Sequence, residues 1–138
     1  MNRRTLQTLA RDRLADARAL LRAHRYAAAY YMAGYAVECA LKACITKHVN
    51  RHDFPDKKLA TDSYTHDLNR LVAAANLRDG LDAACAADEI FEENWGVVCD
   101  WSAEDRYETD ISREDALLLY GAITKRRAGV MTWIRGNW

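Results

Sequence analysis

The sequence predicts an all-α protein, folded as an up-and-down bundle of four or five helices in a single domain, residues 1–138. Only one Pro and six Gly occur in 138 residues, so few positions interrupt helices. Half of the residues are hydrophobic, enough for one proper core. The stretch Tyr26–Lys42 opens with twelve uncharged residues and is apolar nearly all round, as is typical of a helix at the centre of a bundle.

The first half of the chain is expected to form two long helices. The first runs from about Thr5 to Ala23, because its leucines and alanines recur at helical spacing along one stripe. The second runs from about Tyr26 to Val49. Asn50–Thr65 contains the only Pro together with charged and small polar residues, which predicts a loop. One side of the second helix carries short side chains that would let another helix approach closely: Ala29, Ala33, Ala36 and Ala40.

The second half is expected to supply three further helices. A short helix spans about His66–Leu77, and a longer one continues from near Gly80 to Trp101. Ser102–Ile111 is a charged connection. Ser112 then caps the last helix, with Asp115 three residues later in the manner of a capping box. The inner face of this helix carries Leu119, Tyr120, Ile123, Val130 and Ile134.

A polar ridge follows the otherwise apolar second helix. Tyr31, Tyr35, Glu38 and Lys42 fall within about 60° of one another on a 3.6-residue wheel. On a buried helix such a ridge must face a partner or a groove, so it is the first place to look for function. The alternative is structural, because Glu–Lys pairs four residues apart and core tyrosines are both common.

Charge is spread unevenly along a chain whose formal net charge is zero. Residues 1–25 hold seven Arg against two Asp, whereas residues 79–115 hold thirteen acids against two Arg. Residues 116–138 carry four further cations. The pattern predicts a basic face built from both chain ends, opposite an acidic one. The alternative is that solvated helix faces of opposite sign simply pair with each other.

Several classes of protein are disfavoured. The Arg-rich start lacks the apolar region of a secretory signal, and twelve uncharged residues are too few to span a bilayer, so no membrane association is expected. The four cysteines lack C-x-x-C spacing and indicate reduced, buried thiols in a cytoplasmic protein. No metal or cofactor is expected, because Glu-x-x-His pairs and phosphate-cradling glycine loops are both missing.

The string AYYMAGYAVECALKACI, residues 29–45, resembles the second helix of HEPN domains. Three later strings follow in the matching order: THDLNRL, NWGVVCDW and EDRYE. The resemblance implies a helical bundle that forms a homodimer through its helices, with a polar cleft there. It also implies a possible minimal nucleotidyltransferase partner, in a toxin–antitoxin or defence module. That partner would be a separate chain, since no Gly-Ser loop with paired Asp residues occurs here.

Many HEPN domains are metal-independent endoribonucleases, whose signature is an Arg followed after four to six residues by a His. Arg106 is the natural candidate for the Arg, but Ile111, Ser112 and Arg113 occupy the allowed His positions. One literal match, Arg18 to His24, lies in the first helix, away from the usual place, and about one such match is expected by chance. The sequence therefore favours a binding role over catalysis, with a ribonuclease as the alternative.

The resulting hypothesis is a cleft that binds RNA or a nucleotide. The ligand-binding candidates are Glu38, Lys42, Tyr35, Arg106 and Tyr107, and the catalytic candidates are His66 and Arg106. Lys42 and Arg106 would meet phosphate, Tyr107 would stack on a base, and Glu38 would orient a cation. His66 is the plausible proton carrier. A rival hypothesis from another class is a pure interaction subunit that binds no small ligand.

Overall fold

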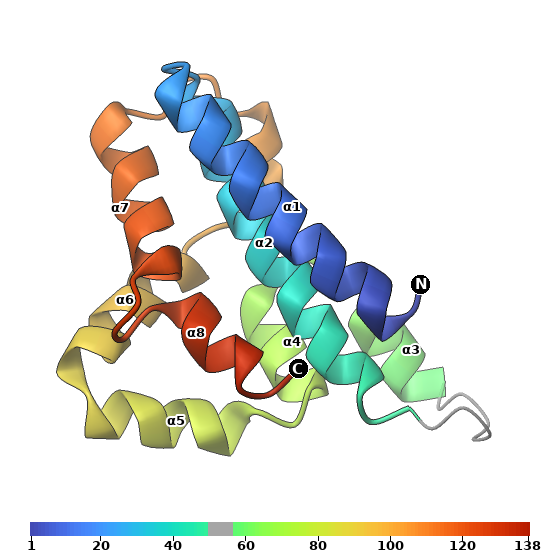
Figure 1. Ribbon diagram of the computed structural model, residues 1–138. Helices are drawn as coiled ribbons and strands as arrows, with labels where there is room; N and C mark the ends of the chain where they lie inside the picture. Colours follow the sequence, from blue (N-terminus) through green and yellow to red (C-terminus); the bar gives the residue numbers. More distant parts are fainter. Residues whose placement is uncertain (50–56) are drawn as a thin grey trace.

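The computed structural model describes residues 1–49 and 57–138, with side chains for residues 1–49 and 59–138. Its described part contains eight α-helices and one 3-10 helix (Figure 1). This confirms the all-α prediction. The long helices α1 and α2 span Arg3–Arg22 and Tyr26–Thr46. The others are α3 Lys57–Ser63, α4 Leu68–Ala74, α5 Arg78–Ala87, α6 Glu89–Cys99, η1 Ala103–Tyr107, α7 Arg113–Thr124 and α8 Val130–Arg135.

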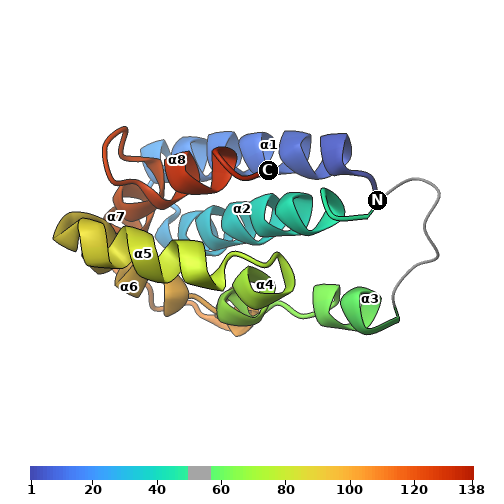
Figure 2. The same cartoon turned by 90° about the horizontal axis from the view of Figure 1, so that it is seen from below.

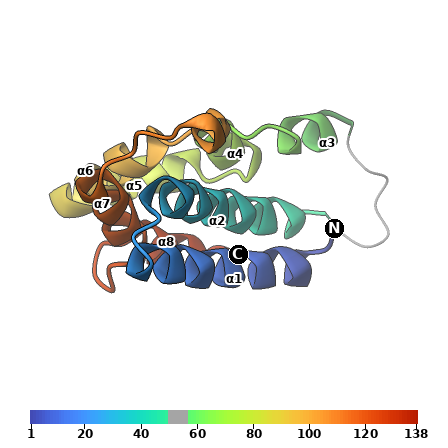
Figure 3. The same ribbon diagram turned by 90° about the horizontal axis from the view of Figure 1, so that it is seen from above.

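Helix α2 lies at the centre of the bundle. Helices α1 and α8 lie on one side of it, and α4 with the segment that contains η1 lies on the other (Figures 2 and 3). The alanines predicted to admit a neighbouring helix are all buried, with at most 2 % exposure: Ala29, Ala33, Ala36 and Ala40. Side chains this short allow α1 to pack closely along α2. The expected central position of this segment is therefore confirmed.

Helix α1 begins and ends close to the predicted positions. Asn2 caps its first turn, where the side-chain oxygen accepts the backbone N–H of Thr5 at 2.8 Å. After Arg22 the chain reverses through His24, whose φ of 58° is left-handed. This tight turn places α2 antiparallel to α1. Helix α2 ends at Thr46, three residues before the predicted Val49.

The predicted loop Asn50–Thr65 is wrong for Lys57–Ser63, which forms α3. Residues 50–56 lie outside the described residues. Leu59 packs against the core, and α3 packs against α4, so tertiary contacts stabilise a segment whose composition predicts a loop. Helix α4 starts two residues later than expected, because Asp67 caps it and accepts the N–H of Arg70 at 3.1 Å.

The long helix predicted from Gly80 to Trp101 is also wrong, because it breaks at Asp88. This residue is extended, with φ −147° and ψ 106°. Its carboxylate accepts the N–H groups of Ile90 and Phe91 at 3.0 and 3.3 Å, so it caps a new helix, α6. The charged connection Ser102–Ile111 likewise contains structure, the 3-10 helix η1, which starts with a capping box.

The last predicted helix is divided in two. Its Ser112 cap is confirmed, because the hydroxyl accepts the N–H of Asp115 at 3.0 Å. Helix α7 stops at Thr124, and a turn with left-handed Ala128 leads into α8. The amide of buried Asn94 donates to the Ala128 carbonyl at 2.8 Å and holds this turn. Helix α8 then folds back, with Val130, Met131 and Ile134 in the core.

The four cysteines are free thiols, as the sequence predicts. Cys39 and Cys44 are buried on α2 as predicted, but the predicted burial is wrong for Cys85 and Cys99, which lie partly exposed on α5 and α6. Within the ranges described, no helix is both long enough and apolar enough to cross a membrane.

Candidate functional site

One side of α2 is left uncovered by its neighbours. Tyr31, Tyr35 and Lys42 are half-buried there, between α1 and the elements α4 and η1. We call this surface the α2 strip. Glu38 lies at its edge and is only 2 % exposed. The ridge predicted from helical spacing therefore exists, and its single carboxylate is buried whereas its tyrosines and lysine reach the surface.

The Glu38 carboxylate links α2 to His66, which lies in the segment just before α4. Its Oε1 lies 2.9 Å from Nζ of Lys42 and 2.6 Å from Nδ1 of His66. A buried carboxylate is stable only with such partners, since desolvation strongly penalises an isolated charge. The Lys42 and His66 side chains keep 23 % and 57 % exposure, so both remain accessible to a ligand.

His66 is held in a defined orientation. It lies just before α4, where Thr65 Oγ1 accepts the N–H of Asp67 at 3.1 Å. With Nδ1–H donating to Glu38, the neutral ring carries its lone pair on Nε2. The imidazole lines a polar pocket of about 510 Å³ beside Asp67, Ser102 and Glu104. A carboxylate-oriented histidine at the edge of a pocket is an arrangement that can accept or release a proton.

Two tyrosines form a stacked platform on the α2 strip. The rings of Tyr31 and Tyr35 are parallel within 3°, with centroids 6.1 Å apart. Burial, and then nearby Cys39 and Glu38, raise the pKa of Tyr35, so its phenol stays protonated at neutral pH. Such rings can stack on nucleic-acid bases, whose π faces are all similar.

Trp101 fixes the 3-10 helix η1 against α2. Its ring packs on Tyr31 at a centroid distance of 5.9 Å and lies directly over Gly34. A Cβ at Gly34 would overlap the indole ring, so glycine is needed in mid-helix to admit it. No pattern in the sequence predicts this contact. Its signal, a glycine inside an apolar helix, does not reveal which side chain fills the space.

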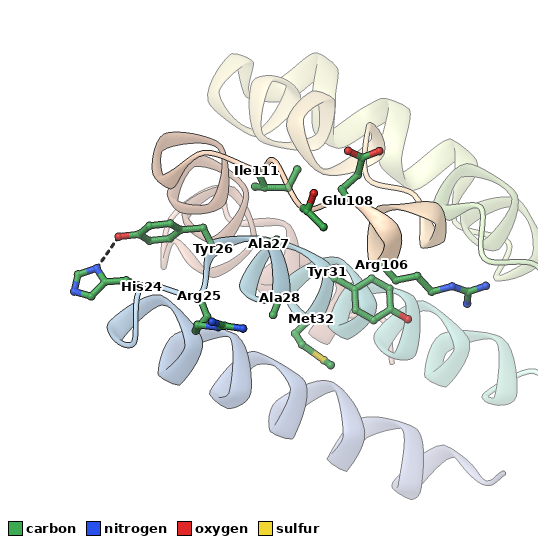
Figure 4. A pocket seen from close by; sticks show the side chains of 11 residues that line it. His24, Arg25, Tyr26, Ala27, Ala28, Tyr31, Met32, Arg106, Glu108 and Ile111 are labelled. Carbon is green, nitrogen blue, oxygen red and sulfur yellow. Dashed lines mark hydrogen bonds between the residues drawn. The ribbon is translucent and has the colours of Figure 1, made fainter.

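Arg106 and Tyr107 lie exposed on η1, and the Arg106 guanidinium stacks 4.8 Å from the Tyr107 ring centroid. In the described residues, Arg106 forms no ion pair with the nearby acids Glu104 and Asp110. Arg106 instead lines a pocket of about 530 Å³ that also includes Tyr31 (Figure 4).

His24 and Arg25 of the α1–α2 turn also line this second pocket. The His24 Nδ1 lies 2.7 Å from the Tyr26 hydroxyl, which holds the ring at the pocket rim (Figure 4). The sequence analysis noted His24 only through its spacing from Arg18. The folded chain places it in the same pocket as Arg106, a proximity that no spacing along the chain could show.

The predicted site residues thus form two groups. Glu38, Lys42 and His66 are in direct contact, whereas Arg106 and Tyr107 lie on the far side of the tyrosine stack. His66 and Arg106 line different pockets. Tyr31 connects the groups, because it stacks on Tyr35 and lines the Arg106 pocket. Cations at both ends and aromatic rings between them suit a ligand with phosphates and bases.

Comparison with known proteins gives one match. The family model described as the HEPN domain matches residues 4–121, which is most of the chain. A comparison with curated proteins and a comparison with solved structures each gave no match. The matched range includes α1, α2, α4 and η1, the elements that build the α2 strip and its two pockets. The chain therefore belongs to the HEPN domain family.

Proposed function

We propose that this HEPN domain binds RNA or a nucleotide on the α2 strip. The observation that carries the proposal is the buried Glu38 carboxylate, held between Lys42 and His66. Membership of the family supports a nucleotide- or RNA-binding, or ribonuclease-like, helical domain. A core-facing carboxylate adds little stability compared with an apolar residue of the same size. Its value lies in orienting the Lys42 ammonium and the His66 imidazole, which both remain accessible, toward a ligand.

The chemistry of the strip divides between phosphate and base. Lys42 and Arg106 would bind phosphate oxygens through charge-assisted hydrogen bonds. Tyr31 and Tyr35 would stack on bases. In other proteins, replacing such an aromatic residue with alanine costs about 1–3 kcal/mol per base. Tyr107, exposed beside Arg106, would stack on a base at the end of the strip.

A binding assay tests this proposal. Fluorescence anisotropy would follow a labelled single-stranded oligouridylate and, separately, labelled AMP over a range of salt concentrations. We expect salt-sensitive binding that Arg106→Gln weakens about tenfold, because an exposed arginine would lose its phosphate contact. Arg113→Gln is the matched control, since Arg113 is also exposed but lines neither of the two pockets. Equal effects of the two variants would contradict the assignment of Arg106.

An endoribonuclease is the second candidate function, favoured by the 2.6 Å contact of His66 with Glu38. In this reaction His66 Nε2 takes the proton of a ribose 2′-hydroxyl, whose oxygen attacks the adjacent phosphorus. The bond from phosphorus to the 5′ oxygen breaks, and that oxygen takes a proton from a water or a cation of the site. The products are a cyclic phosphate and a free 5′-hydroxyl, and no metal takes part.

The catalytic proposal has its own test. Purified protein should cut RNA in the presence of EDTA, and His66→Ala should abolish cutting while RNA binding persists. Unchanged cleavage in this variant would remove His66 from the mechanism. Absence of cleavage by the wild type, together with salt-sensitive binding, would leave the domain a binding module.

We also propose that the protein is a homodimer and that a separate nucleotidyltransferase is its partner, in a toxin–antitoxin or defence module. Exposed Tyr107 and half-exposed Met32 and Tyr35 support an aromatic contact surface on this side of α2. Sedimentation should give twice the chain mass of 15.7 kDa. The rival, an interaction subunit without a ligand, predicts a co-purifying protein and no binding of RNA or nucleotide.

A further inference from the structure

Helix α1 carries a row of arginines on its surface. Arg4, Arg11, Arg18 and Arg22 fall within about 40° of one another on a helical wheel, and all four side chains are exposed. We call them the arginine row. From Arg4 to Arg22 the row extends for about 27 Å along the helix axis. The residues between its members that lie within about 40° of this arc are Gln7, Thr8, Leu14 and Ala15, so no carboxylate interrupts the row.

The row has no carboxylate partners in the described part of the chain. The ion pairs found there involve Glu38, Arg13 with Asp16, and Arg78 with Asp82. None of them joins either basic chain end to the acidic segment 79–115. The alternative considered from the sequence, that the oppositely charged segments pair with each other, is therefore wrong for these residues. The charge of four cations without carboxylate partners is balanced by solvent ions or by a polyanion.

The row gains a further cation from α8. Trp138 lies between Arg11 and Arg135, with its ring centroid 5.1 and 5.8 Å from the two guanidinium carbons. Arg3 donates to the Trp138 carbonyl oxygen at 2.6 Å. The two basic segments of the chain thus lie side by side, as Figure 2 also shows for α1 and α8.

The row is continuous with the functional site at one end. Beyond Arg22 the chain turns through His24 and Arg25, which line the pocket that contains Arg106 and Tyr31 (Figure 4). A polyanion that crossed directly over the side of α1 would meet negative charge, because Asp12 and exposed Asp16 lie on the arc between the row and the α2 strip. A polyanion on the row therefore reaches the strip around the α1–α2 turn.

The length of the arginine row and its chemistry indicate which kind of ligand binds there. A mononucleotide cannot span about 27 Å of helix, whereas a strand with a phosphate at every nucleotide can. A membrane surface is disfavoured, because an interfacial helix needs a free apolar face. The apolar face of α1 is already buried in the bundle through Leu6, Leu14 and Ala17.

We propose that the arginine row binds the phosphate backbone of a single-stranded RNA whose other end lies on the α2 strip. This inference rests on the proposed function and deepens it, because it specifies a strand of many nucleotides as the ligand in place of a mononucleotide. The row supplies affinity without reading sequence, and the pocket at the α1–α2 turn guides the strand from α1 to the tyrosine platform.

The test compares two triple variants of equal charge change. Arg4→Gln, Arg18→Gln and Arg22→Gln remove three members of the row and leave Arg11 on Trp138. Lys47→Gln, Arg70→Gln and Arg113→Gln remove three exposed cations elsewhere. Fluorescence anisotropy would measure the binding of labelled oligouridylates of about 20 and about four nucleotides at several salt concentrations. Co-sedimentation would measure binding to vesicles of phosphatidylserine and phosphatidylcholine under the same conditions.

We expect the row variant to bind the 20-mer about tenfold more weakly near 0.1 M salt, with a salt dependence shallower by about two. Its affinity for the 4-mer should equal that of the wild type, and the control triple should keep the wild-type slope. Equal losses in both triples, or a loss of vesicle binding alone, would overturn the inference. If the 4-mer binds normally and the row variant binds the 20-mer as the wild type does, the role of the arginine row is refuted and the proposed site on the α2 strip is retained. If binding of the 20-mer depends on the row but neither the 4-mer nor AMP binds, the proposed site on the α2 strip is refuted and the role of the arginine row is retained.

Discussion

Glu38 is the residue whose environment most needs an explanation. It is 2 % exposed on a helix that is otherwise lined with Ala, Val and Leu at the same depth. Its two partners come from different segments, Lys42 from one turn along α2 and His66 from just before α4. The buried carboxylate therefore depends on Lys42 and His66, whereas each of these two side chains could turn to solvent if Glu38 were removed. This difference leads to a specific prediction about stability.

Loss of one partner of Glu38 should be tolerated, whereas loss of both should not. We expect Lys42→Ala and His66→Ala to lower the free energy of unfolding by about 1 kcal/mol each, since one hydrogen-bonded partner remains. The double variant should lose about 3–5 kcal/mol, because the buried charge is then unpaired. Urea denaturation of the four proteins would measure the coupling. Additive losses would show that the carboxylate does not depend on these two partners.

Cys44 should make the protein sensitive to alkaline pH. Burial raises the pKa of its thiol from 9.0 to about 11, and the thiol lies 3.8 Å from the Ile134 carbonyl oxygen. Above pH 9 the unfolded state loses the proton while the folded state keeps it, so stability falls as the pH rises from 9 to 11. The loss attributable to this thiol is of order 2 kcal/mol at pH 11.

Denaturation at several alkaline pH values would check this expectation. Cys44→Ala should show a shallower decline of stability between pH 9 and 11. Cys85→Ala, which removes a partly exposed thiol, should retain most of the wild-type decline. A Cys44→Ala curve parallel to that of the wild type would show that other groups cause the alkaline loss.

At the level of secondary-structure elements, the 3-10 helix η1 depends on a single packing contact with α2. Trp101 is 3 % exposed, and its ring occupies the space that a side chain at Gly34 would need. The same ring supports Tyr31, so the contact positions both η1 and the tyrosine platform. Arg106 follows five residues later and reaches its pocket only if η1 remains in this place.

Two glycine substitutions with opposite expected effects test this contact. Gly34→Ala should destabilise the protein by about 1–3 kcal/mol, because the new methyl group overlaps the indole ring of Trp101. Gly96→Ala in α6 meets no atom within 4 Å and should stabilise it by up to about 1 kcal/mol. Thermal unfolding would measure both. Stabilisation by Gly34→Ala would show that Trp101 can move away without cost.

At the level of the whole molecule, the two basic chain segments close the bundle together. Helix α8 packs against α2, α6 and α7 with Val130, Met131 and Ile134 in the core, and Trp138 then contacts Arg11 on the outside of α1. The contacts of Trp138 with Arg3 and Arg11 join residues more than one hundred positions apart in the sequence. They also fix the surface on which the arginine row lies, so the stability of α8 and the shape of the basic face are linked.

Trp138→Ala should loosen the attachment of α8 to α1. Each cation–π contact with Arg11 and Arg135 is worth about 0.5–1 kcal/mol, and the ring's packing adds to this. Hydrogen exchange measured by mass spectrometry should become faster in α8 and at the start of α1, and Trp138→Phe should restore part of the protection. Unchanged exchange in Trp138→Ala would show that the ring does not hold these helices together.

The elements that sequence analysis predicted well are those whose signal is local. The apolar α2, the stripe on α1 and the Ser112 cap depend on spacing within one helix, and all three are present in the structure. The breaks at Asp88 and Ala128 were missed. Asp88 competes for backbone N–H groups, and Ala128 is held in a left-handed turn by Asn94 from another helix. Propensity cannot weigh such contacts.

The amino-acid sequence by itself determined an all-helical bundle, the family to which it belongs and a polar ridge of Tyr31, Tyr35, Glu38 and Lys42 on the central helix. Periodicity fixes which side chains share a helix face, so these features follow from one segment alone. Only the tertiary structure decided that His66 bonds Glu38, that His66 and Arg106 line separate pockets, and that the α1–α2 turn joins the arginine row to the strip. Those relations depend on how different helices pack, and packing is set by contacts between residues far apart along the chain.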